Sequence, residues 1–304
     1  MANRFPNQTC VFCTRPSVGV GEHVWPHWFI GDFHGQGPFT TSRAGVPYTK
    51  RDKVTPLTTN SLQGVHVPAC EQCNAVLDTT IEKPAKPLVR RLMDHRDSSD
   101  ELLLTADECA TLARWILKVG ILAAHPAADH DHPGLQRDPE VSGLDFVRSE
   151  WLDWLRAGSP PPDGFSVFIT RRSLRGEAAE PDVKQKIVLP RVAVEGEDLD
   201  FMSRSFGFSG VNATIVWHPG WPISHAQVDS GRALRLWPHP TEADFGALPI
   251  VHPKELAFWD GSIGVRMFSS DEYASGTEVP LSVGSDHFSA FFGGEIPPTP
   301  NTDQ

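Results

Sequence analysis

The sequence lacks any apolar run of the roughly 18 residues that a membrane-spanning helix needs. Its N-terminus, MANRFPNQTC, also lacks the apolar stretch of a secretory signal peptide. These absences predict a cytoplasmic protein with no membrane partner. Basic residues are outnumbered as well, because 27 Lys and Arg face 38 Asp and Glu, for a net charge of −11. That charge excludes a protein that coats nucleic acid non-specifically.

The acidic excess is unevenly distributed along the chain. Residues 1–100 carry 11 Lys and Arg against 9 Asp and Glu, so the excess lies in the rest of the chain. A weakly basic N-terminal third permits local contact with phosphate. The length of 304 residues allows two domains or one large one. The 27 prolines and 25 glycines favour β-rich or irregular structure over a helical bundle.

Cysteine is scarce, with five residues in all, yet four of them form two Cys-x-x-Cys pairs, Cys10/Cys13 and Cys70/Cys73. This spacing is too tight for an ordinary disulfide framework, and one such pair alone could be a redox dithiol. Two pairs in one segment instead predict a tetrahedral, structural Zn²⁺ site with four thiolates. Cys109 is left over and is predicted to be a buried, unreactive thiol within a helix.

The pattern along the chain predicts an α+β protein. Residues 1–95 form a zinc-bound unit, residues 96–158 a helical segment, residues 159–294 an antiparallel β-rich domain of unknown role, and residues 295–304 a disordered tail. The β-rich assignment rests on short runs of β-branched and aromatic residues, such as NATIVWHP and IGVRMFS, separated by turn residues.

Three helices are expected, and PLVRRLMDH is a candidate for a further short one. The clearest covers residues 105–124, where Thr105 is an N-cap followed by acids in the first turn. A second covers FVRSEWLDWLRAG. A third follows Cys73 and should end at Pro84 and Pro87, whereas the segment from Gly31 to Gly64 has no periodicity and is predicted to be a long connection.

Glu22-His23-Val24-Trp25-Pro26 lies between the cysteine pairs, and Asn74 directly follows the second pair. This order resembles the zinc-bracketed HNH endonucleases of the His-Me (ββα-metal) finger superfamily over residues 10–82. The resemblance implies a ββα-metal unit in which His23 is the general base. It also implies a catalytic Mg²⁺ or Mn²⁺ held by Glu22 and Asn74, with Glu82 or Asp78 as a further ligand or supporting group.

The chemistry is consistent without the resemblance. A neutral imidazole near pH 7 can take a proton from a water that attacks a phosphodiester. A hard cation held by carboxylate and amide oxygens can stabilise the developing charge. His66 lies near the position of the family's middle asparagine and is the candidate for its supporting role. Lys86, Arg90 and Arg91 are candidates for contact with nucleic-acid phosphate, with DNA the expected partner and RNA the alternative.

Other interpretations remain open at this stage. The unit could be a catalytically inactive zinc module that binds nucleic acid or a protein. Asn74 could be a helix N-cap, and Asp78 and Glu82 could belong to a solvated helix face, as could the three basic residues. His23 could serve only as a hydrogen-bonding group within the zinc unit.

Overall fold

A computed structural model describes the chain over several continuous ranges and a number of short segments between them. The continuous ranges are residues 3–32, 64–130, 147–162, 164–172, 198–217 and 230–251. The described part contains helices and mainly antiparallel sheets, which confirms the predicted α+β class. Within it, no helix is both long enough and apolar enough to span a bilayer. The predicted tail at residues 295–304 lies outside the described residues.

The helices include a continuous row of three consecutive segments. They are α1 His27–Asp32, α2 Glu71–Leu77, α3 Lys83–Asp94, α4 Ala106–Ala124 and α6 Ser149–Ala157, and a π-helical turn, η1 Asp78–Glu82, joins α2 to α3. The prediction that Pro84 and Pro87 end the helix after Cys73 is wrong. Pro84 lies in the first turn of α3, where a missing N–H is tolerated. Pro87 lies inside α3, and the helix continues past it with an apolar face buried.

The helix predicted at residues 105–124 is confirmed as α4. The Thr105 hydroxyl accepts a hydrogen bond from the Glu108 N–H, and the Glu108 carboxylate accepts one from the Thr105 N–H, which forms a capping box. Cys109 is fully buried in α4, as predicted. Gly120 is needed for packing, because a Cβ there would lie 2.4 Å from Cδ1 of Ile215 on the neighbouring sheet. The helix predicted before residue 158 is confirmed as α6.

The largest sheet has six strands, with the order β15-β9-β13-β12-β19 and β17 beside β9. All its pairings are antiparallel except that of β17 with β9, so the predicted antiparallel character of the C-terminal part is largely confirmed. Its strands are β9 Phe165–Arg172, β12 Asp198–Phe208, β13 Val211–Trp217, β15 Leu234–Trp237, β17 Ile250–Val251 and β19 Gly261–Arg266.

A small sheet with the order β1-β6-β8 positions the candidate site. It pairs β1 Glu22–His23 with β6 Val65–Val67, and β6 with β8 Asp129–His130, both antiparallel. The remaining strands form short ladders: β2 Phe39–Thr40 with β5 Thr58–Thr59, β3 Ser42–Arg43 with β4 Val46–Pro47, β7 Leu103–Leu104 with β16 Ala243–Asp244, β11 Arg191–Val192 with β14 Ile223–Ser224, and β10 Lys186–Val188 with β18 Ala257–Phe258 and β20 Leu281–Ser282.

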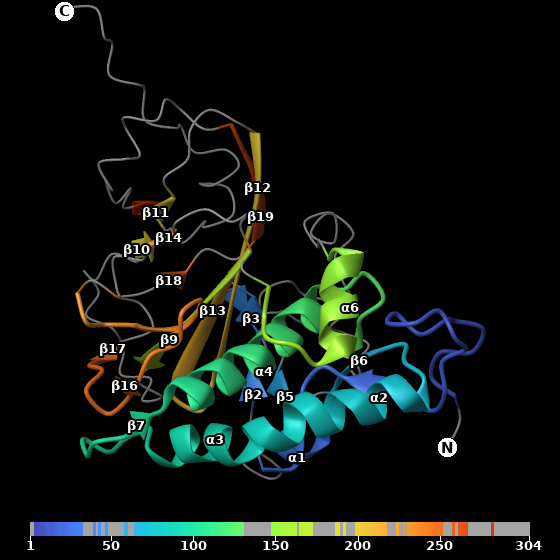
Figure 1. Ribbon diagram of the computed structural model, residues 1–304, viewed down its shortest axis with the longest axis horizontal. Helices are drawn as coiled ribbons and strands as arrows, with labels where there is room; N and C mark the ends of the chain where they lie inside the picture. Colours follow the sequence, from blue (N-terminus) through green and yellow to red (C-terminus); the bar gives the residue numbers. More distant parts are fainter. Residues whose placement is uncertain are drawn as a thin grey trace, which may run out of the picture.

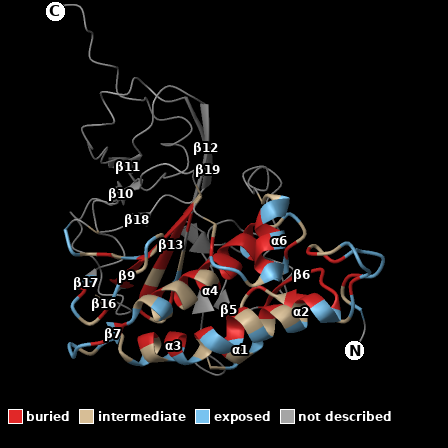
Figure 2. Cartoon of the chain, in the orientation of Figure 1, coloured by how far each residue is buried: buried red, intermediate tan, exposed pale blue. Residues whose placement is uncertain are grey.

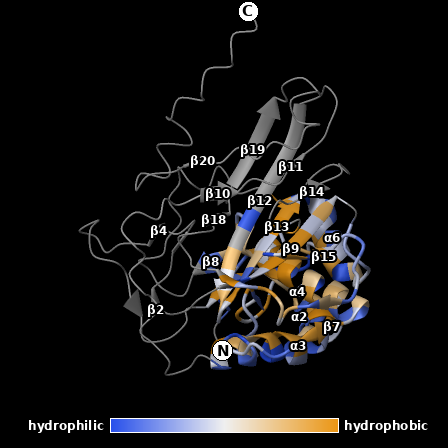
Figure 3. Cartoon of the chain, turned by 90° about the vertical axis from the view of Figure 1, so that its left-hand side faces the viewer, coloured by the Kyte–Doolittle hydropathy of each residue, from blue (hydrophilic) through white to orange (hydrophobic). Residues whose placement is uncertain are grey.

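Helix α4 lies between the row formed by α2, η1 and α3 and the large sheet (Figure 1). It is buried along most of its length (Figure 2). Apolar residues are concentrated in α4, β9 and β13 (Figure 3). One hydrophobic core takes side chains from each of the three folded segments expected from the sequence. The segment boundaries near residues 95 and 158 therefore remain a prediction.

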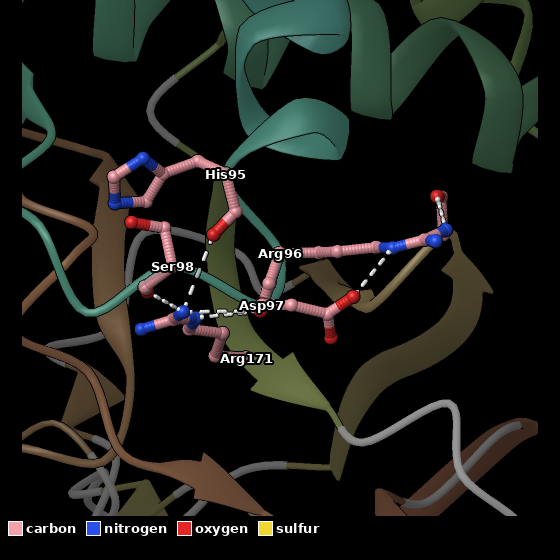
Figure 4. Close-up of polar contacts among 6 residues, drawn as sticks. His95, Arg96, Asp97, Ser98 and Arg171 are labelled. Carbon is pink, nitrogen blue, oxygen red and sulfur yellow. Dashed lines mark hydrogen bonds and ion pairs between the residues drawn. The ribbon is translucent and has the colours of Figure 1, made fainter.

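The end of α3 is fixed to the large sheet by Arg171 on β9. Its guanidinium donates hydrogen bonds to the carbonyl oxygens of His95, Arg96 and Ser98, just after the last turn of α3 (Figure 4). It also donates to the carbonyls of Gly246 and Leu248. A cation at a helix C-terminus satisfies carbonyl groups that have no intrahelical partner. This buried arginine thus joins the helical row to the sheet.

Candidate metal centre and histidine site

The first cysteine pair lies in a tight hairpin-like turn. An isolated antiparallel bridge joins Thr9 to Pro16, and the Cys10 N–H donates to the Arg15 carbonyl. The Thr14 N–H donates to the Cys10 carbonyl at 3.0 Å, and Thr14 adopts a left-handed backbone with φ 61°. This closed turn directs Cys10 and Cys13 to the same place.

The second cysteine pair lies at the start of α2, where Cys70 is the N-cap residue. Two backbone hydrogen bonds hold the pairs together: the Val11 N–H donates to the Pro68 carbonyl, and the Val18 N–H donates to the Ala69 carbonyl, each at 3.0 Å. The interpretation of Asn74 as a helix N-cap is wrong, because Cys70 is the N-cap of α2 and Asn74 lies within the helix.

The four Sγ atoms lie within 4.8 Å of one another, with Cys13 and Cys70 3.5 Å apart. A tetrahedral Zn²⁺ with Zn–S bonds of about 2.3 Å places its sulfurs roughly 3.8 Å apart. The cluster is therefore close enough to bind a metal ion, and its donor set is consistent with structural zinc.

The surroundings of the sulfurs support the same conclusion. Burial raises the pKa of the Cys10 and Cys73 thiols. The hydrogen bond from Arg15 lowers the pKa of Cys13 to about 6. Buried thiols resist ionisation on their own, but a coordinated cation holds them as thiolates. Arg15 also donates to the Gln72 side chain at 2.5 Å and so links the two cysteine turns.

The β1-β6-β8 sheet aligns three polar residues across its strands. His23 is opposite His66, and His66 is opposite Asp129. Residues directly opposite one another share a face of the sheet, and the His23 and His66 ring centroids are 4.2 Å apart. His23 is half-buried and His66 is buried. Asp129 is exposed and forms an ion pair with Arg4. The structure thus brings His23 and His66 together, as the supporting role of His66 requires.

Glu22 lies on the other face of the sheet, because successive residues of a strand alternate in direction. Its carboxylate is 2.7 Å from Nζ of Lys118 on α4. The carboxylate of Glu82, from η1, is also 2.7 Å from the same Nζ. The two acids predicted to bind a catalytic ion thus share a buried ammonium group. A divalent ion held by both would have to displace Lys118.

The charges in this group are strongly coupled. Burial raises the pKa of Glu22 to about 8, although Lys118 acts in the opposite direction. Burial alone would lower the pKa of Lys118, but the carboxylates of Glu22 and Glu82 outweigh it and raise that pKa. Lys118 is therefore charged at neutral pH, in a place that water does not reach.

The remaining amide and acidic candidates, Asn74 and Asp78, have different partners. Asn74 Nδ2 donates to the Gly21 carbonyl at 3.2 Å, which places this side chain beside the residue that precedes β1. Gly21 has φ +75°, and a Cβ there would meet the Val67 carbonyl oxygen at 2.2 Å, so only glycine fits this approach of β1 to β6. Asp78 forms a surface ion pair with Lys83.

The three basic candidates on α3 differ in their contacts. Lys86 and Arg90 both lie over the ring of Trp28, at 5.7 and 5.8 Å from its centroid. Arg90 also forms a bidentate ion pair with Asp32. Arg91 forms hydrogen bonds to both carboxylate oxygens of Glu108, which gives it a structural role at the start of α4. Lys86 and Arg90 therefore share one aromatic surface, and Arg91 is directed elsewhere.

Two residues of the site were missed by the sequence analysis. Lys118 lies three residues after Trp115 and four before Leu122, within the apolar stripe of α4. A lysine in such a stripe is a recognisable signal of a buried charge with a partner. Asp129 gave no local signal, because only the pairing of β8 with β6 brings it opposite His66.

Among the described residues, no other group of three or more His, Cys, Asp or Glu side chains converges in a way that could hold an ion. The four-cysteine cluster and the face carrying His23 are therefore the two features from which a function can be inferred. Comparisons of the chain with protein-family models, with curated proteins and with solved structures find no match.

Proposed function

We propose that the N-terminal unit, residues 1–95, is an HNH-type endonuclease that hydrolyses phosphodiester bonds of nucleic acid. The observation that carries the proposal is the placement of His23. His23 lies on β1 and packs against His66 on the paired strand β6. Helix α2 comes directly after β6 in the chain. A cysteine cluster suited to zinc joins the segment before β1 to the start of α2. The pairing of β1 with β6 and the position of α2 directly after β6 support the proposed ββα-metal unit.

In the proposed reaction His23 acts as the general base. Its imidazole takes a proton from the attacking water, and the water oxygen forms a bond to phosphorus as the bond to the leaving oxygen breaks. A half-buried position suits this role, because the ring remains reachable while the His66 ring restricts its motion. A bound Mg²⁺ or Mn²⁺ would supply charge stabilisation for the phosphate and the leaving oxygen.

Asn74 is the proposed ligand of that ion. Its Nδ2 atom is used by the Gly21 carbonyl, so Oδ1 is the atom that could bind a cation. Glu22 and Glu82 are held by Lys118 instead. Mg²⁺ commonly keeps several waters and takes oxygen ligands from substrate phosphate, so a small protein ligand set is compatible with its chemistry.

DNA is the proposed substrate, with RNA as the alternative. The surface of Trp28, Lys86 and Arg90 offers an aromatic ring flanked by two cations. Cations bind phosphate, which suits this surface to contact with the nucleic-acid backbone. Trp28 belongs to α1, which begins only four residues after His23.

The test is cleavage of supercoiled plasmid, single-stranded DNA and RNA with Mg²⁺ or Mn²⁺. His23→Ala should reduce the cleavage rate by about 10²–10⁴-fold, the usual contribution of a general base, with zinc content unchanged. His27→Ala is the matched control, since His27 is an exposed histidine on α1 whose ring centroid is 6.0 Å from that of His23. Equal cleavage by wild-type protein and His23→Ala would refute the proposal.

One observation favours a second function, a zinc module that binds nucleic acid or a protein without cleaving. The ammonium of Lys118 is paired with two carboxylates that an ion-dependent nuclease of this type would be expected to use. In that case the wild-type protein would bind nucleic acid or a protein partner, and no divalent ion would support cleavage.

A further inference from the structure

The ammonium group of Lys118, on α4, lies inside a set of oxygen atoms supplied by two other parts of the chain. It contacts the carboxylates of Glu22 and Glu82 at 2.7 Å each. It also donates to the backbone carbonyl of His23 and, at 3.1 Å, to that of Val24. These four groups, called the oxygen cage below, come from η1 and from the start of the chain around β1.

The oxygen cage is closed to solvent. The exposed fraction is 0% for Lys118, 2% for Glu22 and 8% for Glu82. Carboxylates buried at this level are stable only when a cation or protons balance their charge. Two carboxylates and two backbone carbonyls are also the kind of ligands that bind hard divalent cations such as Ca²⁺. The chemistry of the cage is therefore that of a cation site, and a side chain of the protein fills it.

We propose that Lys118 is a tethered cation, which occupies the oxygen cage in place of a metal ion and positions the backbone of the strand that carries His23. Its contacts with the carbonyls of His23 and Val24 fix the path of β1 from the core side, while the His23 ring packs against His66 on the other side of the sheet. Lys118 is thus a positioning residue. Its consequence for catalysis rests on the proposed nuclease function, but its role as the occupant of the cage does not.

The first test removes the tether and offers a replacement cation to the full-length protein. In Lys118→Ala the cage keeps its four oxygen groups and gains an empty space. The melting temperature of this variant should fall, and millimolar Ca²⁺ or methylammonium should raise it again. Lys118→Met fills the same space with an uncharged side chain and should show no recovery.

Leu122→Ala is the control for a general loss of packing, because Leu122 is fully buried one turn further along α4. Neither cation should raise its melting temperature, nor that of the wild-type protein. Recovery confined to Lys118→Ala supports the proposal. An absence of recovery with both cations, or an equal response of all variants, overturns it.

A measurement on the wild-type protein covers the case in which Lys118→Ala does not fold. The cage should slow proton exchange between the Lys118 ammonium and water, so its ¹H–¹⁵N correlation should be visible at neutral pH with through-space contacts to Val24. Exposed lysine ammonium groups exchange too fast to be seen. A spectrum without any such protected ammonium signal contradicts the proposal.

These readouts separate the two proposals. Melting temperature and the ammonium signal report on the cage whether or not the protein cleaves nucleic acid. If cleavage is observed, partial recovery of the rate in Lys118→Ala on addition of methylammonium, with no recovery in Lys118→Met, would extend the positioning role to His23. Recovery of stability without any cleavage in the wild type would leave the tethered cation in place and refute only the nuclease.

Discussion

Replacing Lys118 by methionine tests how strongly the buried charges stabilise the fold. Methionine keeps much of the side-chain volume but leaves the carboxylates of Glu22 and Glu82 without a cation. Removal of one member of a buried ion pair typically costs about 3–5 kcal/mol. Lys118 also gives up its hydrogen bonds to the carbonyls of His23 and Val24. Because burial raises the pKa of Glu22 to about 8, that carboxyl is already mostly protonated at pH 7 and Glu82 carries most of the uncompensated charge, so the free energy of unfolding should fall by about 3–5 kcal/mol.

Urea unfolding followed by tryptophan fluorescence measures this loss. The triple variant with Glu22→Gln and Glu82→Gln added should regain most of it, because replacing a whole buried ionic group by neutral groups is often nearly neutral in stability. Coupling between these sites is expected, since they are in direct contact. A loss below about 1 kcal/mol for Lys118→Met, or no recovery in the triple variant, would show that the fold does not depend on this buried ion pairing.

Further predictions concern Glu22, the four cysteines, Arg171 and two basic residues of α3. Burial raises the pKa of Glu22 to about 8, above the value of about 4.3 in the unfolded chain. The stability contributed by the protonated Glu22 carboxyl is therefore complete below the unfolded pKa and is lost as the pH rises toward 8. Wild-type stability should therefore fall over this range relative to Glu22→Gln, by at most about 1.4 kcal/mol per pH unit, and parallel pH curves would contradict this. Metal analysis should find one Zn²⁺ per chain, and Cys73→Ser should lower both zinc content and melting temperature; full zinc occupancy in that variant would exclude the four-cysteine site. Arg171→Met should lower the free energy of unfolding by about 3 kcal/mol or more, because five backbone carbonyls lose a charged donor; an unchanged urea midpoint would contradict its role. Replacing Lys86 and Arg90 together by alanine should weaken nucleic-acid binding and reduce the slope of log K against log salt by about 2, whereas an unchanged slope would remove this surface from the interface.

Local patterns in the sequence predicted the local structure well. The capping residues and apolar stripe of 105–124 define a helix that the structure confirms as α4. The two Cys-x-x-Cys pairs predicted a cluster that the structure brings together across 57 residues. Both signals depend on residues that are close in sequence or on a chemistry with few alternatives. The β-rich C-terminal part was predicted for the same reason, from short alternating runs and turn residues.

The details of the site depend on contacts that no local pattern contains. Lys118 meets Glu82 across 36 residues and the His23 carbonyl across 95. Asp129 reaches His66 only through strand pairing. The alternation of a strand could have shown that Glu22 and His23 point to opposite faces, but this requires knowing that both lie in a strand. The prediction that Pro84 and Pro87 end a helix was wrong because the effect of proline on a helix depends on its position. No sequence pattern indicated the π-helical turn η1.

The proposed role of the His23 imidazole is to take the proton from the attacking water. This role is tested by the rate of Mg²⁺-dependent plasmid cleavage by His23→Gly, with and without added imidazole. We expect a large loss of activity in this variant and a partial, saturable recovery when imidazole enters the space left by the side chain. Cleavage that persists in His23→Gly without imidazole would contradict it.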